Sequence, residues 1–295
     1  MGKIRIGTSG WRYAGWRGDF YPRGLAQARE LAHISRVMDT VEINGSHYSL
    51  QSPRSYQAWH DATPDDFVFS VKGSRFITHM LRLGSEAQET ALANFFASGV
   101  LLLRAKLGPI LWQFPARRAF EPEAMERFLR SLPKDTEVAA ALAARHDDRV
   151  PEPVLATDRR RRLRHAIEIR HDSFCTGAFI RMLRRHRAAL VVSDATADWP
   201  RLEDVTADFV YLRLHGTEKL YGGSYPDRAL ARWARRLVTW AAGEEPSDAQ
   251  RVSRPARKRA SRDVFCYFDN DEKVRAPYDA MRLMKRLERL NARRS

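Results

Sequence analysis

Charged side chains alternate with apolar ones near the end of a short segment, "FVYLRLHG" (209–216). Arg213 and His215 are separated by Leu214, and Gly216 closes the segment. Side chains two positions apart in a strand share a face, and a half-buried strand normally turns its polar face to water. An arginine can instead bind an anion, and a histidine can act as a general acid or base. These residues raise the question of whether this face points into a site.

The same arrangement recurs in most other apolar segments, where it adds carboxylates and further cations. The residues are Glu42 and Asn44, Ser70 and Lys72, Gln113, Glu168 and Arg170, Asp194, and Asp269 with Asn270. Burying so many charges is costly unless they pair with one another or hold a ligand. An ion-pair network that neutralises itself and a ligand pocket are the two interpretations, and we favour the pocket.

The segments that carry these residues alternate with helical patterns. We expect strands at 4–9, 40–44, 67–72, 109–114, 165–170, 189–194, 209–215 and 264–270. Helices are expected at 25–36, 52–62, 86–105, 122–132, 175–187, 226–241 and 275–292. This alternation predicts an α/β fold, a (β/α)8 TIM barrel in a single domain over 1–295, with the polar strand ends at its C-terminal mouth. An open doubly wound sheet is the rival, but no strand precedes a glycine-rich dinucleotide fingerprint.

Two arginine-rich segments, 145–164 and 243–262, interrupt this alternation. Neither has apolar periodicity, so we expect mobile basic insertions in αβ loops, on the face opposite the usual active site. Solvated insertions are the favoured interpretation, and an electrostatic anchor for a polyanion is the alternative.

Composition limits the partners and the compartment. The formal net charge is +15, from 51 basic and 36 acidic residues, which attracts polyanions such as nucleic acid. The excess of Arg over Lys and the abundance of Ala would also follow from a GC-rich genome. No apolar run is long enough to span a bilayer, no signal peptide is evident, and the two cysteines lie far apart. We therefore expect a cytoplasmic protein with no membrane partner.

Three loops after predicted strands add candidate ligand-binding side chains. The segment 7–22 is dense in aromatic residues, which suit a flat ligand or form a small core of the loop itself. The segment 72–83 adds cationic residues suited to anionic groups, and "YGGSY" (221–225) has the glycines of a turn or a mobile flap. The candidates from these loops are Trp11, Tyr13, Arg75, His79, Tyr221 and Tyr225.

The chain resembles the YecE-like proteins, a family catalogued as a domain of unknown function. The motifs that carry the resemblance are GTSGWRYAGWRGDFYP (7–22), TVEIN (40–44), FSVKGSRFITHMLRL (69–83), ILWQFP (110–115), EIRH (168–171), YLRLHG (211–216) and FDND (268–271). The resemblance implies a TIM barrel and no established activity. Such barrels have been likened to endonuclease IV and sugar-isomerase barrels, which bind divalent metals, but that is analogy at the level of the fold. His47 and Asp269 depart from the family pattern, and both are residues that can ligate a metal.

We expect a site that binds or processes a phosphate-containing ligand, a small molecule or nucleic acid; if it is an enzyme, it is a hydrolase. The candidate catalytic residues are Glu42, Lys72, Glu168, Asp194 and His215. The candidate ligand-binding residues are Trp11, Tyr13, Asn44, Arg75, His79, Gln113, Arg170, Arg213, Tyr221, Tyr225 and Asn270.

No cofactor is expected; a divalent metal is the less favoured alternative, because fixed cations in the same site would repel it. Its ligands would come from Glu42, Glu168, Asp194, His215 and Asp269. A carbohydrate-active enzyme with Glu42 and Glu168 as its carboxylate pair and a non-catalytic binding module for nucleotides or nucleic acid are the alternatives. The sequence does not predict the oligomeric state.

Overall fold

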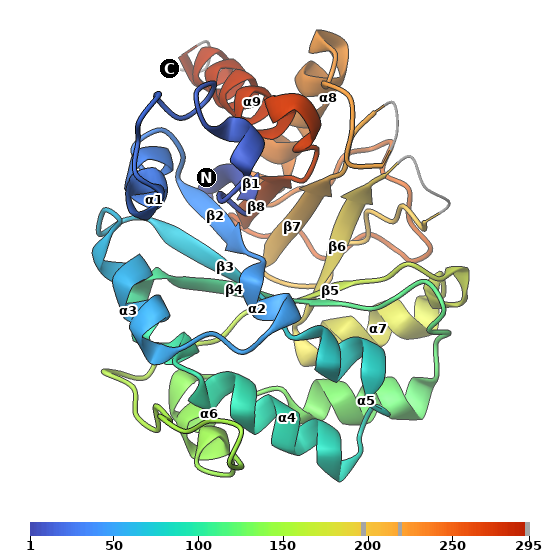
Figure 1. The fold of residues 1–295 in the computed structure, drawn as a ribbon. Coiled ribbons are helices and arrows are strands. Elements are labelled where there is room, and N and C mark those ends of the chain that lie inside the picture. The colour runs from blue at the N-terminus through green and yellow to red at the C-terminus, as the bar shows by residue number, and fades with distance from the viewer. Residues whose placement is uncertain (196–198, 218–219, 293–295) are drawn as a thin grey trace. The chain divides into compact units, whose positions relative to one another are not determined.

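The eight strands of this computed structural model form a closed barrel in which they follow one another in chain order (Figure 1). The structure describes residues 1–195, 199–217 and 220–292. The strands are β1 (Ile4–Ser9), β2 (Thr40–Ile43), β3 (Val68–Lys72), β4 (Leu107–Gln113), β5 (His165–Glu168), β6 (Ala189–Asp194), β7 (Phe209–Leu214) and β8 (Asp263–Phe268). The predicted α/β barrel is confirmed, and each strand lies within two residues of its expected bounds.

Helices follow most strands, as expected. They are α1 (Glu30–Ile34), α2 (Gly45–Tyr48), α3 (Pro53–Asp61), α4 (Glu86–Ala97), α5 (Pro122–Ser131), α6 (Thr136–Ala143), α7 (Gly177–His186), α8 (Asp227–Ala241) and α9 (Arg275–Ala292). The described residues between β6 and β7 contain no helix, in agreement with the sequence. Among the described residues, none of the helices combines the length and hydropathy needed to cross a bilayer.

Four helices differ from the prediction, among them the four-residue α2, which was not predicted. The helix expected at 25–36 is limited to α1 and a preceding 3-10 turn. The helix expected at 86–105 ends at Ala97, because Gly99 adopts a left-handed conformation (φ 111°) before the 3-10 segment η4 (Val100–Lys106). Helix α6 was not predicted; the Asp135 side chain begins it by accepting hydrogen bonds from the backbone N–H groups of Glu137 and Val138.

The chain divides into two compact units, which we describe separately. Unit 1 comprises residues 1–41 and 175–295, and unit 2 comprises residues 42–174. In unit 1, β6 pairs with β7, β7 with β8 and β8 with β1, all parallel. In unit 2, β3, β4 and β5 pair in that order, also parallel. Within each unit the carboxyl ends of these strands therefore lie at one edge.

Aromatic and aliphatic side chains fill both units. Every residue of β7 is buried, so neither of its faces is solvated. In unit 1, α8 packs against α9, and the rings of Trp233 and Trp240 lie close together on α8. In unit 2, α4 packs against α6, and Trp112 on β4 contacts Phe95 and Phe128. The polar residues of the strand ends are thus held in a dense apolar surrounding.

Both arginine-rich segments lie between a helix and a strand, as expected. Most of 145–164 and all of 243–262 lack helix and strand. Several of their charges are nevertheless engaged: Arg160 pairs with Asp135, and Asp204 accepts hydrogen bonds from the backbone N–H groups of Val252 and Ser253. The mobility of these segments, their status as insertions and the single-domain organisation stay predictions.

Candidate functional site

In unit 2, polar side chains gather at the carboxyl ends of β3, β4 and β5. Gln113 and Glu168 are register partners at the ends of β4 and β5, and Lys72 ends β3. Arg170 donates to Glu168 at 2.8 Å and to the Oε1 atom of Gln113 at 3.0 Å. The sequence therefore correctly placed Gln113, Glu168 and Arg170 together.

His79 lies next to this group and is surrounded by cations. Its Nε2 atom is 3.4 Å from Nε2 of Gln113. Burial first, and then the charges of Lys72, Arg170, Arg117 and Arg118, lower the pKa of His79 to about 4, so its ring is neutral at neutral pH. We call Lys72, His79, Arg117, Arg118 and Arg170 the His79 cluster. Its net charge is positive.

The guanidinium groups of Arg117 and Arg118 are fixed by backbone carbonyls. Arg117 donates to the carbonyl oxygen of His79 at 2.8 Å, and Arg118 donates to that of Leu81 at 3.0 Å. Carbonyl oxygens position these cations without neutralising them. Neither residue was predicted for the site, although both follow the predicted strand 109–114 in a βα loop, where site residues of barrels are usual.

Short-range contacts attach α2 to the end of β3 in unit 2. The Ser46 hydroxyl donates to the carbonyl oxygen of Lys72 at 2.7 Å, and Nδ1 of His47 donates to that of Gly73 at 2.9 Å. The ring of His47 in turn contacts the ring of His79, with 5.3 Å between centroids. His47 therefore has a positioning role beside the cluster. Glu42 is buried and Asn44 half-buried in the same unit.

In unit 1, a second polar group lies at the ends of β1, β7 and β8. Arg213 donates to the Ser9 hydroxyl at 2.7 Å and to Asp269 at 2.9 Å. Nδ1 of His215 is 3.0 Å from the same Asp269 oxygen, but its geometry does not meet that of a hydrogen bond. His215 is fully buried, and its Nε2 atom has no hydrogen-bond partner among the residues that the structure describes. Burial, followed by the charge of Asp269, raises the pKa of Asp271.

Three other residues predicted for the site, Asp194, Asn270 and Tyr225, make contacts with neighbouring segments, and their role in a site stays a prediction. Asp194 accepts a hydrogen bond from Nε1 of Trp233 at 3.0 Å and pairs with Arg201. Asp279, fully buried, accepts hydrogen bonds from the Asn270 side chain and from the backbone N–H of Tyr225. Asp279 was not predicted from the sequence, because an acidic residue within an expected helix is usually on the surface.

The loop after β1 packs largely on itself. Trp11, Trp16 and Tyr21 are buried, and the Tyr21 hydroxyl donates to the carbonyl oxygen of Trp11 at 2.7 Å. The Tyr13 hydroxyl donates to the carbonyl oxygen of Ser9, and the Tyr13 ring contacts that of Trp16. These contacts agree with a small core of the loop, the second of the two interpretations that the sequence left open.

The glycine-rich loop after β7 is partly described. Tyr221 is exposed, and its ring centroid is 5.8 Å from that of His215. Its backbone N–H donates to the carbonyl oxygen of His215 at 2.6 Å, with Tyr221 itself at positive φ. Residues 218 and 219 of this loop lie outside the described residues. The loop therefore approaches His215, while a role for it as a flap stays a prediction.

No metal centre emerges from the described side chains. They contain no group of three or more His, Cys, Asp or Glu residues placed to hold a metal ion. The five residues proposed as ligands if a metal is present are therefore not grouped around one metal position among the described side chains.

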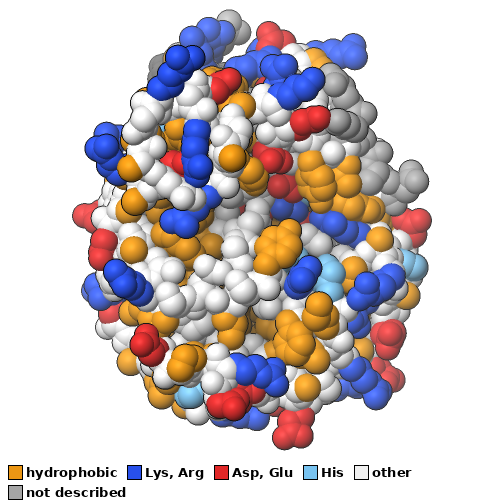
Figure 2. All heavy atoms as spheres, viewed as in Figure 1, with side chains coloured by type: hydrophobic (Ala, Val, Ile, Leu, Met, Phe, Trp, Pro, Cys, Tyr) orange, Lys and Arg blue, Asp and Glu red, His pale blue; other side chains and the backbone are white. Residues whose placement is uncertain are grey.

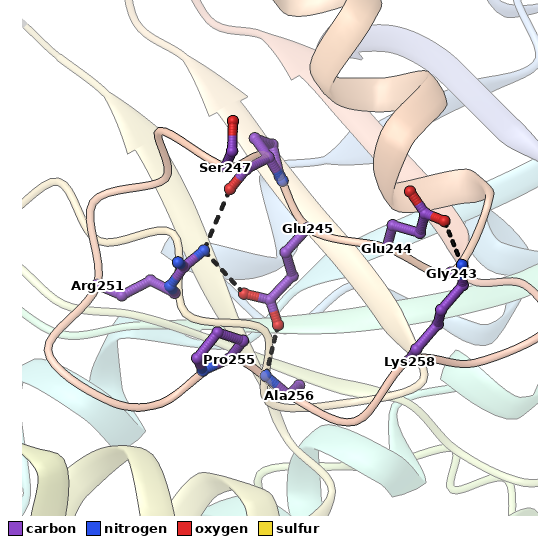
Figure 3. A pocket seen from close by; sticks show the side chains of 9 residues that line it. Gly243, Glu244, Glu245, Ser247, Arg251, Pro255, Ala256 and Lys258 are labelled. Carbon is purple, nitrogen blue, oxygen red and sulfur yellow. Dashed lines mark hydrogen bonds and ion pairs between the residues drawn. The ribbon is translucent and has the colours of Figure 1, made fainter.

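A pocket of about 270 Å³ lies in the segment 243–262 of unit 1 (Figure 3). Figure 3 shows that the charged residues along its wall pair with one another: Lys258 with Glu244, and Arg251 with Glu245. Glu245 also accepts a hydrogen bond from the backbone N–H of Ala256 at 2.6 Å. These contacts neutralise the pocket, so it differs in character from the cationic end of unit 2.

The surplus positive charge of the chain does not collect in one patch of the visible face. Figure 2 shows Lys and Arg side chains spread over that face and interspersed with Asp and Glu. Net charge alone therefore does not locate a binding site, and the His79 cluster is the more specific feature.

Comparison with known proteins places the chain in a family. The family described as "Protein of unknown function DUF72" matches residues 5–294. The UPF0759 protein YunF of Bacillus subtilis is 31% identical over 115 residues, which cover 38% of this chain and only 40% of that protein.

Two solved structures have the same fold. A DUF72 family protein from Thermotoga maritima is 24% identical, with a TM-score of 0.73 over 97% of this chain and 99% of that one. A DUF72 family protein from Enterococcus faecalis is 17% identical, with a TM-score of 0.70 over 97% and 95%. The expected resemblance is confirmed as far as the family, although these matches do not carry the YecE name. The chain belongs to the DUF72 family.

Proposed function

We propose that the protein binds a phosphate-bearing ligand through the His79 cluster, at the carboxyl ends of β3, β4 and β5. The observation that carries this proposal is that Arg117 donates to the His79 carbonyl oxygen and Arg170 donates to Gln113, whose amide lies 3.4 Å from the His79 ring. Lysine and arginine donors in such an arrangement suit a phosphate, because hydrogen bonds between two charged groups are stronger than neutral ones.

The charge balance of the cluster supports an anionic ligand. Glu168 is engaged by Arg170 at 2.8 Å, so that acid is already matched by a cation. Arg117 and Arg118 donate to carbonyl oxygens, and the charge of Glu121 partly offsets that of Arg118. A bound phosphate would add negative charge among these cations.

Titration of His79 tests the proposal directly. A phosphate near the ring would offset the surrounding cations and raise the pKa of His79 from about 4, because the protonated ring would then be favoured. Two-dimensional NMR of the histidine rings, with and without pyrophosphate, measures this change. An unchanged titration of His79 at saturating pyrophosphate would contradict the proposal.

Calorimetry with pyrophosphate provides the second test. Lys72→Gln removes one buried cation of the cluster, and we expect it to weaken binding roughly tenfold or more, as for a lost hydrogen bond to a charged group. Lys134→Gln is the matched control, because Lys134 is exposed and lies beside Pro133, which contacts His165 at the opposite end of β5. Equal weakening by both variants, or no binding by the parent, would overturn the proposal.

Turnover of the ligand is a further part of the proposal. A hydrolase would release inorganic phosphate from a phosphomonoester or nucleotide, and Glu168→Gln would abolish that release while the fold survives. Glu42 belongs to the same unit as the His79 cluster, whereas Asp194 and His215 belong to unit 1, so their catalytic roles are a separate prediction. The carbohydrate alternative has less support, because a glycosidase needs a carboxylate pair and not the cations that gather near His79.

A further inference from the structure

Four apolar side chains lie exposed on α2, on the residues that follow it and on the π-helical turn η3 (Phe76–Met80) of unit 2. We call them the aromatic patch: Tyr48, Leu50, Phe76 and Met80, with exposed fractions of 67%, 36%, 38% and 59%. Large apolar side chains gathered at a surface mark interaction sites more often than single exposed ones do.

Arginines flank both rings of the aromatic patch. The guanidinium carbon of Arg75 lies 5.4 Å from the centroid of the Tyr48 ring, and that of Arg149 lies 5.8 Å from the centroid of the Phe76 ring. Both distances are within the range of cation–π contact. The patch therefore combines planar apolar faces with positive charge.

Tyr48 of the aromatic patch lies close to the His79 cluster, with the buried ring of His47 between them. The ring of His47 lies 5.2 Å from the ring of Tyr48 on one side and 5.3 Å from the ring of His79 on the other. Met80 follows His79 directly in η3. If a phosphate binds at the His79 cluster, a group attached to that phosphate can therefore contact Tyr48.

We infer that the aromatic patch and the His79 cluster together bind single-stranded nucleic acid, with bases on Tyr48 and Phe76 and phosphates at the cationic side chains. This inference rests on the proposed function and names the class of its ligand. Bases stack on aromatic rings whatever their sequence, and the backbone is held by a positively charged surface. An acidic peptide would satisfy the charge but would leave the rings without planar partners.

Fluorescence anisotropy with a labelled oligothymidylate tests the inference. Tyr48→Ala and Phe76→Ala should each weaken binding roughly tenfold, the usual loss when one stacking ring is removed. Tyr48→Phe keeps the ring and should bind like the parent. Tyr278→Ala is the matched control, because Tyr278 is a comparably exposed tyrosine on α9, and it should leave binding unchanged.

An oligomer of abasic sites separates stacking from charge. It has the same number of phosphates and no bases, so the parent should bind it more weakly than oligothymidylate, and Tyr48→Ala should not weaken it further. Equal binding of the two oligomers by the parent, or parental affinity of the Tyr48→Ala and Phe76→Ala variants for oligothymidylate, would overturn the inference. Displacement of oligothymidylate by an acidic peptide at equal charge concentration would instead indicate a protein partner.

The same binding measurements distinguish a failure of the nucleic-acid inference from a failure of the proposed phosphate binding. If the parent binds pyrophosphate in a manner sensitive to Lys72→Gln but does not bind oligothymidylate, only the nucleic-acid inference is wrong. If pyrophosphate is not bound at all, the proposed function fails as well. Circular dichroism of each variant checks the fold, and Tyr48→Ala should be neutral there because the side chain is exposed.

Discussion

His165 at the start of β5 should make the stability of the protein depend on pH. Nε1 of Trp112 donates to its Nδ1 at 3.1 Å, and its Nε2 lies 2.8 Å from the carbonyl oxygen of Pro133. An indole N–H can only donate and a carbonyl oxygen can only accept, so these partners fix the neutral ring with its proton on Nε2. Protonation of Nδ1 would place its N–H opposite the indole N–H of Trp112, and the hydrogen bond between them would be lost.

The size of the effect follows from the pKa. Burial lowers the pKa of His165 to about 4 from its ordinary value of 6.5, with the Pro133 carbonyl opposing the change. Between these values the unfolded chain binds a proton and the folded chain does not, so stability falls as pH falls from 6.5 toward 4. At about 1.4 kcal/mol for each pH unit, the free energy of unfolding should decrease by roughly 3 kcal/mol.

Urea unfolding at a series of pH values measures this decrease. His165→Gln keeps a donor and an acceptor but cannot be protonated, so its stability should depend less on pH than that of the parent. The acidic groups that titrate in the same range are common to both proteins and cancel in the comparison. The relevant quantity is therefore the difference in the free energy of unfolding between pH 7 and pH 4, parent against variant.

A second histidine tests whether the reasoning is specific. Burial and then the surrounding cations also lower the pKa of His79 to about 4, so His79→Gln should remove its own part of the pH dependence and leave the part due to His165. Should the parent and His165→Gln lose equal stability between pH 7 and pH 4, the buried neutral histidine is not the cause, and the argument is wrong.

Three further predictions concern contacts of single residues. Asp269→Asn should lower the free energy of unfolding by about 3–5 kcal/mol, because it leaves the buried Arg213 guanidinium without its carboxylate; an unchanged urea midpoint would contradict this. Gly73→Ala should destabilise by about 1–3 kcal/mol or more, because a Cβ there would lie 2.3 Å from a ring carbon of Trp112; thermal unfolding measures it, and a neutral result would mean that the ring moves aside freely. Asp204→Ala should speed proteolytic cleavage within 243–262, because Asp204 holds that segment; cleavage at the parental rate would show that the segment is held otherwise.

The sequence predicted the barrel because its signal is local and repeated. Each strand is a short apolar run with polar residues at its end, and that alternation survives in the structure with small differences in bounds. Helix α6 was not predicted because "TEVAAALA" has no apolar periodicity. Its only helical signals are the high helix propensity of its alanines and the Asp135 cap.

The partners of the site residues could not be predicted in the same way. Arg170 and Glu168 were expected on one face from their spacing, and they form a pair. The contact of Arg170 with Gln113, however, depends on the register between β4 and β5, which no local pattern encodes. Asp279 lies in α9 and determines the positions of Asn270 and Tyr225 through contacts between segments that local patterns do not connect.

The two polar groups differ in how their charges are matched, and this difference is the reason for placing the ligand in unit 2. In unit 1, Arg213 is matched by Asp269, and Asp194 is matched by Arg201, so carboxylates and guanidinium groups occur in pairs. In unit 2, Arg170 is matched by Glu168, whereas Arg117 and Arg118 are held by carbonyl oxygens that carry no full charge. Cations fixed in this way repel one another at a cost to stability, and an anion that binds among them removes that repulsion. Burial is the largest cause of the lowered pKa of His79, and the charges of these cations lower it further. A surplus of positioned cations, rather than the number of charged residues, is therefore the feature that distinguishes a binding site from a structural ion-pair network in this protein.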